Sequence, residues 1–486
     1  MSSSSTDLPD LGRLPLFGHL EAVPTPSPAD LGALADVAAR PPAPTPIGTR
    51  RRAGRAQQGA PAAPAIDWAL VRSLRTAAAK ELAEVLRERA GIDPVEHRAI
   101  GEQIVADLVR AQMAADNAAG HGADRGMAVQ LQAAVLDALF GLGRLQPLVD
   151  NPELENIEVL GCDPTVLLWA DGRVTTGPPV VDSDEELIEE LAFIATRASE
   201  ANQRTFSPAA PLLNLRLDGG ARLAAHAWVS RRPSAIIRLH RLVHVSLADL
   251  VARGTMTPEV HDLLARAVRR RMSIVVAGEM GAGKTTLLRA LCAEFDPWES
   301  IATVETEFEL HLDEMPERHR RVHAVEMRPG SGERLADGTI AGEINLTALV
   351  RAAWRWNADR LILGEVRGPE VMQMFDLMGG GTGGLCTVHG KDAHSAIDRL
   401  VTLAMGAGPQ VTAGYAERQV GQHVDLVVHI NAVQTETGAK HRHISQILAL
   451  EHTGDGLAKT ELYAAGPDRI ARLVHMPANL ANALGL

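Results

Sequence analysis

The chain has 486 residues, a formal net charge of −12 at pH 7 and an aromatic content of 3%. This length exceeds what one hydrophobic core supports, so about two to four domains are expected. The acidic balance argues against broad, sequence-independent nucleic-acid binding, which needs a basic surface. Cys162, Cys292 and Cys386 are far apart and form no CxxC pair, so neither a disulfide framework nor a zinc site is expected.

The N-terminal part of the chain indicates a cytoplasmic protein. Met1–Ser5 has neither a basic stretch nor an apolar core, so no secretion signal is expected. No apolar run approaches the roughly 18 residues that cross a bilayer, so no transmembrane segment is expected either. Residues 1–65 are rich in Pro, Ala and Ser, bury little apolar surface and are predicted to form a disordered tail. The protein could still be peripheral at the inner face of the membrane by docking on a partner.

Helical periodicity begins at Asp67, a predicted N-cap, and predicts a small helical bundle over residues 66–119. The glycine-containing segment 120–126 is predicted to be a linker. Residues 127–245 mix helical and strand patterns and are predicted to form an α+β domain. Its expected elements are a helix over 129–140, strands over 156–160, 166–169, 221–227 and 234–239, and a hairpin turn at Asp171-Gly172.

Residues 246–486 alternate helical patterns with strands that are apolar throughout. This alternation predicts an α/β domain whose parallel sheet is covered on both faces. The expected strands lie at 273–277, 301–304, 361–364 and 385–388, followed by a late pair at 424–430 and 444–450.

The segment Gly278–Thr286 has the pattern of a phosphate-binding loop, with a predicted strand before it and a predicted helix after it. Its glycines let successive backbone N–H groups turn toward a phosphate chain at the positive end of the helix dipole. Lys284 is expected to neutralise the β and γ phosphates, and Thr285 to ligate Mg²⁺. The predicted nucleotide-binding residues are Gly278, Gly281, Ala282, Gly283, Lys284, Thr285 and Thr286.

Three further polar positions follow predicted strands of the same sheet. Glu365 directly follows strand 361–364, where a carboxylate is needed to orient or activate a water molecule for hydrolysis. Glu305 follows strand 301–304, with Glu307 and Glu309 close behind, and the pattern leaves open whether these acids belong to the site or to a solvated edge. His389 ends the strand that follows a glycine run, on the sheet edge where ligands bind in open α/β sheets.

These four segments together resemble the secretion ATPase superfamily, which powers type II and type IV secretion and type IV pili. The resemblance is closest to its CpaF-type branch, which serves tight-adherence pili. The family's Walker A loop, acidic box, Walker B strand and histidine box correspond to 278–286, 305–309, 364–368 and 381–389. Upstream, Phe140–Leu148 and Asn156–Val159 look like the opening of the family's N-terminal domain.

The resemblance also shows departures from the family pattern. Thr306 stands where the acidic box usually has a second acid, and Gly381 and Thr382 stand where an earlier His-Asp pair is usual. The tetracysteine insert of the type II secretion branch is absent from this sequence.

The resemblance implies a RecA-like P-loop ATPase domain over 246–486, with the α+β domain and the helical bundle before it. It further implies a homo-hexameric ring that binds ATP and Mg²⁺ and docks on an inner-membrane platform protein of a pilus or secretion system. Glu305 would act on Mg²⁺ through water, and His389 would sense the γ-phosphate. The candidates for an arginine that contacts phosphate are Arg222, Arg238, Arg355 and Arg367.

Three other functions remain open. A RecA-type nucleic-acid motor would need a basic groove with aromatic stacking residues. A small-molecule kinase would need a substrate pocket and a lid, and no segment identifies either one. A nucleotide-gated assembly scaffold would bind ATP but hydrolyse it slowly, in keeping with the substitutions at Thr306 and Gly381.

Overall fold

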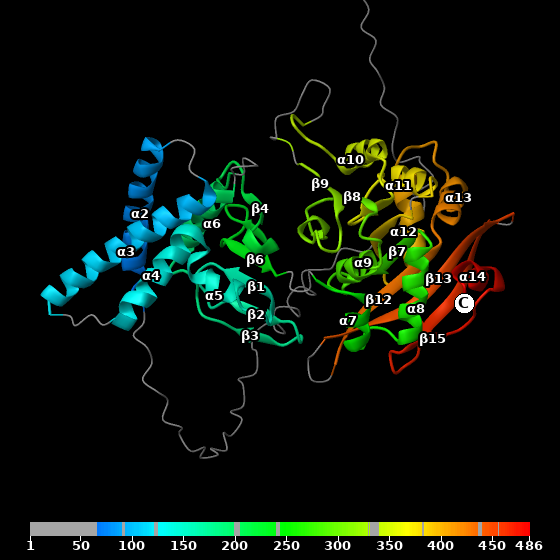
Figure 1. The fold of residues 1–486 in the computed structure, drawn as a ribbon, viewed down its shortest axis with the longest axis horizontal. Helices are drawn as coiled ribbons and strands as arrows, with labels where there is room; N and C mark the ends of the chain where they lie inside the picture. The colour runs from blue at the N-terminus through cyan, green and yellow to red at the C-terminus, as the bar shows by residue number, and fades with distance from the viewer. Residues whose placement is uncertain are drawn as a thin grey trace, which may run out of the picture. The chain divides into compact units, whose positions relative to one another are not determined.

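The computed structural model describes residues 66–486 except 90–92, 121–124, 199–204, 240–243, 329, 331–339, 382, 436–439 and 455. The fold of this part of the chain is drawn in Figure 1. The expected tail over 1–65, the middle of the expected linker, and Thr382 lie outside the described residues.

Three helices among the described residues share one apolar core: α2 (Trp68–Glu88), α3 (Pro94–Ala118) and α4 (Arg125–Phe140) (Figure 1). The predicted N-cap at Asp67 is confirmed, because its carboxylate accepts hydrogen bonds from the N–H groups of Ala69 and Leu70. Helix α4 was predicted to belong to the α+β domain that follows it, whereas its apolar side chains are buried against α2 and α3. Fully buried members of this core are Val71, Ala78, Val105 and Val135.

No single helix among the described residues is long and apolar enough to cross a membrane. Helix α4 and the segment Gly143–Val149, which comprises η3 (Gly143–Leu145) and α5 (Gln146–Val149), reach that length and apolarity only as a pair bent by 109°.

A six-stranded antiparallel sheet follows, in the order β3-β2-β1-β6-β5-β4. One face packs its alternating apolar side chains against α6 (Asp184–Ala198). The predicted strands of this region and the hairpin turn at Asp171-Gly172 are confirmed, and β3 and β4 were not predicted. The strands are β1 (Leu154–Leu160), β2 (Val166–Trp169), β3 (Val174–Thr176), β4 (Leu212–Arg216), β5 (Arg222–His226) and β6 (Ser234–Arg238), with η4 (Asp218–Gly220) between β4 and β5.

The last part of the chain forms a sheet in the order β15-β14-β13-β12-β7-β11-β10-β8-β9. The strands from β12 to β9 are parallel, and the strand β7 that precedes the glycine loop lies between β12 and β11. The parallel strands are β7 (Ile274–Gly278), β8 (Ser300–Glu305), β9 (Arg321–Glu326), β10 (Arg360–Leu363), β11 (Leu385–His389) and β12 (Leu426–Gln434). The predicted α/β class is confirmed, and β9 was not predicted.

The predicted parallel sheet has an antiparallel extension at one edge, which was not predicted. Strands β13 (Lys440–Thr453), β14 (Gly456–Ala465) and β15 (Ala471–Leu473) extend the sheet in antiparallel pairs beyond β12. The physical reason is the short connection after Gln434, because a parallel return needs a crossover of about a dozen residues or more.

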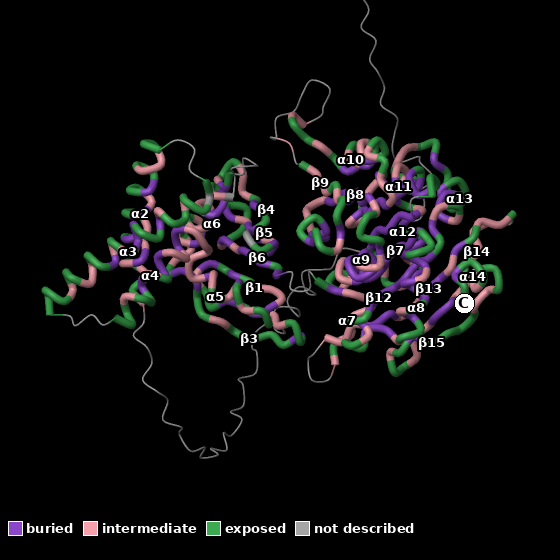
Figure 2. Tube along the Cα trace, viewed as in Figure 1, coloured by how far each residue is buried: buried purple, intermediate pink, exposed green. Residues whose placement is uncertain are grey.

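Helices cover both faces of this sheet, as predicted. Successive residues of β7 alternate between the two cores, with Ile274 and Val276 in one and Val275 and Ala277 in the other. The first core includes α7 (Leu247–Ala252), α8 (Pro258–Arg269), α9 (Lys284–Cys292) and α14 (Ala478–Leu484). The second core includes α10 (Leu346–Ala353), α11 (Val371–Met378), α12 (Ala393–Met405) and α13 (Ala413–His423). Figure 2 shows the buried residues concentrated around β7, β8 and α12.

Candidate nucleotide site

The glycine loop lies between the end of β7 and the start of α9, as the sequence predicts. Gly281 and Gly283 have φ values of +75° and +101°, in the left-handed region that favours glycine. A Cβ atom at Gly278 would lie only 2.4 Å from the carbonyl oxygen of Ile430, so no side chain fits there. Ala282 is buried in the core beneath the loop and anchors its middle.

The side chain of Lys284 is buried and folded back onto its own loop. Its Nζ donates hydrogen bonds of 3.0 Å to the carbonyl oxygens of both Gly278 and Glu279, and lies 3.2 Å from Nδ1 of His389. Burial lowers the pKa of Lys284, and the negative charges of Glu365 and Glu309 oppose that shift. The ammonium group therefore rests among neutral acceptors, with two carboxylates close enough to favour its charge.

Strands β11 and β10 bring His389 and Glu365 together at the same sheet edge. Nε2 of His389 lies 2.7 Å from Oε1 of Glu365, a close contact rather than an aligned hydrogen bond. The other carboxylate oxygen of Glu365 accepts hydrogen bonds of 2.9 and 2.6 Å from Arg367. Burial and the charge of Lys284 lower the pKa of His389. Lys284, His389 and Glu365 thus form one continuous line of contacts.

Two glutamates of the acidic segment at the end of β8 make different contacts. Glu305 is buried, and its carboxylate accepts from the backbone N–H groups of Glu309 and Leu310 at 2.8 and 2.9 Å. Burial raises the pKa of Glu305 to about 7. Glu309 instead reaches the loop, because its Oε2 accepts a 3.0 Å hydrogen bond from the hydroxyl of Thr285.

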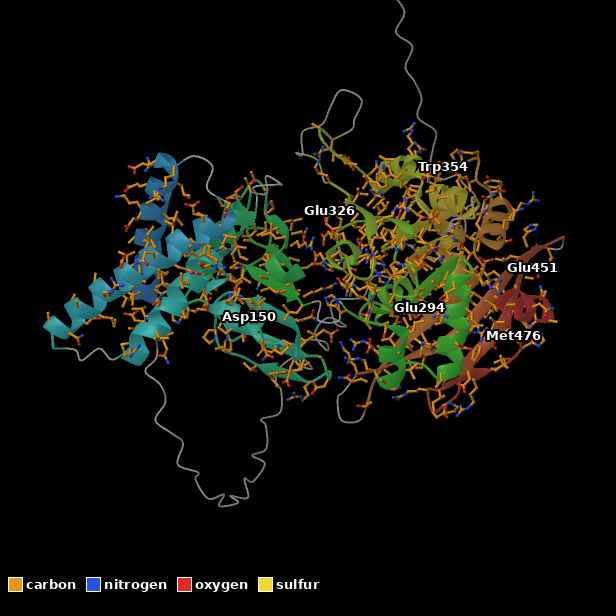
Figure 3. The ribbon with its side chains drawn as sticks, viewed as in Figure 1. Asp150, Glu294, Glu326, Trp354, Glu451 and Met476 are labelled. Atoms are coloured by element: carbon orange, nitrogen blue, oxygen red, sulfur yellow. The ribbon has the colours of Figure 1, made fainter. Side chains whose placement is uncertain are left out.

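The same segment is also held from β9. Glu326, labelled in Figure 3, accepts a 3.0 Å hydrogen bond from the backbone N–H of Phe308. Glu305 and Glu326 together shape the turn that presents Glu309. Glu309 was predicted only as a member of the acidic box, and its position four residues after Glu305 is the signal that the sequence offers.

Three arginines stand in register across the antiparallel sheet. Arg216 pairs with Arg222 on the neighbouring strand, and Arg222 pairs with Arg238 on the next. Nη1 of Arg222 lies 2.5 Å from Glu309 Oε1 and 3.1 Å from Glu307 Oε2. Arg238 contacts the loop, since its Nη2 lies 3.7 Å from Sδ of Met280. Arg222 and Arg238 therefore both contact segments of the site.

Of the other arginines near this region, Arg355 and Arg367 were candidates from the sequence, whereas Arg216 and Arg442 were not. Arg355 is exposed in η6 (Trp354–Trp356), beside the labelled Trp354 of Figure 3, and Arg367 pairs with Glu365. Arg216 contacts Nδ1 of His311 at 3.0 Å. Arg442 was not predicted, and it lies over the loop with Nε 3.4 Å from the carbonyl oxygen of Gly281. The pairing of strands sets the positions of Arg216 and Arg442. No local motif in the sequence signals either position.

The residues around Thr285 fit a magnesium ion. Mg²⁺ prefers hard oxygen ligands, often from one or two side chains together with substrate phosphates and water. The hydroxyl of Thr285 and the carboxylate of Glu309 supply such oxygens 3.0 Å apart. Within the described part of the chain, no group of three or more His, Cys, Asp and Glu side chains is arranged to hold a metal by itself.

The fold and the site together define a class of protein. A glycine loop with a buried lysine leads from a central parallel strand into a helix, and the next two strands end beside a histidine and a glutamate. This arrangement is that of a P-loop ATPase with a RecA-like sheet. The family model for type II/IV secretion system proteins matches residues 215–464, more than half of the 486 residues. The chain therefore belongs to the family of type II/IV secretion system proteins.

Curated relatives agree with this assignment. The chain is 29% identical over 290 residues to the type IV secretion system protein PtlH homolog of Bordetella bronchiseptica, covering 55% of this chain and 81% of that protein. It is 28% identical over 341 residues to the type IV secretion system protein VirB11 of Brucella suis, covering 63% of this chain and 89% of that protein. The predicted membership of the secretion ATPase superfamily is confirmed, and the CpaF-type branch stays a prediction.

Among solved structures, the chain is similar to the X-ray structure of the Yersinia pseudotuberculosis ATPase DotB. The TM-score is 0.47 at 16% sequence identity, and the match covers 66% of this chain and 80% of that chain.

Proposed function

We propose that this ATPase hydrolyses Mg-ATP as a ring-forming motor that powers protein secretion or pilus assembly across the cell envelope. The observation that carries the proposal is the continuous line from Lys284 through His389 to Glu365. It supports hydrolysis because it joins the group expected to stabilise phosphate charge to the group expected to activate water. Family membership supports the biological setting.

The proposed roles follow from the chemistry of each side chain. The loop N–H groups and Lys284 bind and stabilise the phosphates, and Glu365 orients or activates the attacking water. His389 responds to the γ-phosphate, since its ring lies between Lys284 and Glu365. Thr285 and Glu309 would hold Mg²⁺ through their side-chain oxygens. When bound, Mg²⁺ neutralises negative charge that develops on the phosphate oxygens.

Glu305 has a different proposed role from the one that the resemblance implies. Its carboxylate accepts hydrogen bonds from two backbone N–H groups of the acidic segment, so it positions Glu309. Its action on Mg²⁺ is then indirect, through the placement of Glu309.

Arg222 and Arg238 are proposed to stabilise nucleotide phosphates. In this structure Arg222 pairs with Glu307 and Glu309, whose carboxylates are chemically similar to phosphate oxygens as guanidinium partners. The homo-hexameric ring, the inner-membrane platform protein as its partner and the cytoplasmic location are parts of the same proposal. The type IV secretion relatives support the setting in a secretion system.

A steady-state ATPase assay of the wild type and of Glu365→Gln tests the proposal. We expect the substitution to lower kcat by about a hundredfold or more, because the amide cannot accept a proton from water. Glu451→Gln is a matched control, since Glu451 is exposed on β13 (labelled in Figure 3). Equal turnover by wild type and Glu365→Gln would contradict the motor. Lys284→Ala should abolish tight nucleotide binding.

The second candidate is a nucleotide-gated assembly scaffold. It is favoured by Thr306, which stands where the family usually has an acid. Its buried hydroxyl has no hydrogen-bond partner among the residues that the structure describes. A scaffold predicts tight ATP binding that Lys284→Ala removes, together with slow turnover that Glu365→Gln leaves unchanged. The two assays therefore separate the candidates.

A further inference from the structure

A buried histidine, His429 on β12, lies close to the nucleotide site and has no role in the proposed reaction. Its side chain is 2% exposed. Nε2 lies 3.2 Å from the carbonyl oxygen of Gly390, and Nδ1 lies 2.5 Å from the hydroxyl of Ser445. Both ring nitrogens are therefore engaged, one by the residue that directly follows His389.

The sheet topology makes this contact a link between strands that are not neighbours. His429 lies on β12 opposite Ala277 of β7, and β7 in turn separates β12 from β11. Gly390 follows the last residue of β11. The imidazole of His429 therefore connects β12 to the end of β11 across the strand that carries the phosphate loop.

A β-bulge places the hydroxyl that orients this ring. The register between β12 and β13 shifts at His429/Ile430, so Gln446 faces His429, Ile444 faces Ile430, and Ser445 is the extra residue between them. Bulges redirect side chains and are frequent beside active sites. Here the bulge turns the hydroxyl of Ser445 toward Nδ1 of His429.

Neighbouring hydrogen bonds hold the same short loop. The N–H of Gly390 donates to the carbonyl oxygen of Gly278 at 3.4 Å, and the N–H of Ala393 donates to the side chain of Gln446 at 3.3 Å. A Cβ atom at Gly390 would lie 2.9 Å from the Cβ of Ala396, so the loop passes close against α12. The main chain after His389 is thus held from β7, β12 and β13.

We propose that His429 is a positioning residue for His389, which it fixes through the carbonyl group of Gly390 with Ser445 setting the orientation of its ring. This inference rests on the proposed role of His389 in hydrolysis. The carbonyl of Gly390 can only accept, so Nε2 of His429 carries the proton and Nδ1 accepts from Ser445 when the ring is neutral.

The charged groups around His429 agree with a neutral ring. Burial lowers its pKa, the backbone contact with Gly390 and the charges of Asp392 and Glu279 oppose that shift, and Lys284 adds to it. A neutral ring is a donor at one nitrogen and an acceptor at the other, as the two contacts require.

Replacement of His429 by leucine tests the inference with the full chain. We expect kcat to fall about ten- to a hundredfold, because a small misplacement of a catalytic group is enough for such a loss. The KM for ATP and the affinity for a fluorescent ATP analogue should change less than about threefold, since the phosphate loop is intact. His429→Gln should restore most of kcat, because its amide can donate to Gly390 and accept from Ser445.

Two further variants keep the test decisive. Ser445→Ala removes a single hydroxyl and should lower kcat about two- to fivefold, even if His429→Leu does not fold. In a His389→Ala background, His429→Leu should cause no further loss of kcat, because it acts through His389. His319→Phe is the control, since it also replaces a buried histidine.

The outcomes distinguish this inference from the proposed function. An inactive wild type would contradict the proposed function. An active wild type whose kcat is unchanged by His429→Leu and Ser445→Ala would overturn the inference. A loss that persists undiminished in the His389→Ala background would overturn it as well, and so would a failure of His429→Gln to restore turnover.

Discussion

The ammonium group of Lys284 lies 3.2 Å from Nδ1 of His389, although 105 residues separate the two positions in the chain. On the opposite side of the ring, Nε2 lies 2.7 Å from Oε1 of Glu365. Burial and the charge of Lys284 lower the pKa of His389, whereas the charge of Glu365 opposes that shift. The ring therefore lies between a cation and a carboxylate that act on its protonation in opposite directions.

The first prediction concerns His389. His389→Ala should lower kcat about ten- to a hundredfold while the affinity for a fluorescent ATP analogue changes less than about threefold, because the phosphate contacts come from the loop. Steady-state ATPase and equilibrium binding measurements check both values. His394→Ala on the exposed side of α12 is the control. An unchanged kcat would show that His389 takes no part in hydrolysis.

The second prediction separates the two glutamates of the acidic segment. Glu309→Gln should raise the Mg²⁺ concentration for half-maximal ATPase activity about tenfold, because a carboxylate that faces Thr285 becomes neutral. Glu305→Gln should shift it much less, because the amide oxygen still accepts from Glu309 and Leu310. Magnesium titrations of activity measure both shifts. A larger shift for Glu305→Gln would show that Glu305, rather than Glu309, faces the Mg²⁺ ion.

The third prediction concerns Arg442 above the loop. Its Nη2 lies 2.8 Å from Oε1 of Glu155 on β1, and each side chain is 27% exposed. Arg442→Glu should lower the thermal midpoint and raise the KM for ATP, because two like charges then face each other beside Gly281. Adding Glu155→Arg should restore part of both, with a coupling energy of about 1 kcal/mol. A double-mutant cycle measures it, and strictly additive effects would contradict a direct pair.

The fourth prediction concerns stability and pH. Burial is the main cause that lowers the pKa of His319 from its ordinary value of 6.5 to about 4. Between these values the unfolded chain binds more protons than the folded chain, so the free energy of unfolding falls as the pH falls. Between pH 7 and 4.5, the free energy of unfolding should fall by about 2 kcal/mol less in His319→Phe than in the wild type.

Chemical denaturation at several pH values measures this difference between wild type and variant. The phenyl ring retains the packing against Phe295, whose ring centroid lies 6.3 Å from that of His319. An identical pH dependence in the two proteins would show that His319 does not contribute to it.

Much of the ATPase domain could be predicted because its signals are local. The parallel strands are apolar and bounded by glycines or acids, and the loop at 278–286 combines a residue pattern with its flanking elements. Because parallel strands place their carboxyl ends at one edge, Glu365 and His389 could be expected to meet near Lys284.

The remaining features depend on hydrogen-bond register, which no local pattern encodes. The bulge at Ser445 and the approach of Arg442 to the loop both follow from the register in which β13 aligns with β12. The roles of Glu305 and Glu309 depend on which carboxylate turns inward after β8. Alternating acids in a sequence do not reveal that choice.

The close approach of Gly278 to the carbonyl oxygen of Ile430 has a mechanical consequence. The loop is backed by main-chain atoms, which cannot be shortened or turned aside as a side chain can. A displacement of the loop toward β12 must therefore displace β12 as a whole, together with His429, which lies one residue before Ile430. Such a movement would reach His389 through Gly390. The strands behind the loop would therefore couple the position of the loop to the position of His389.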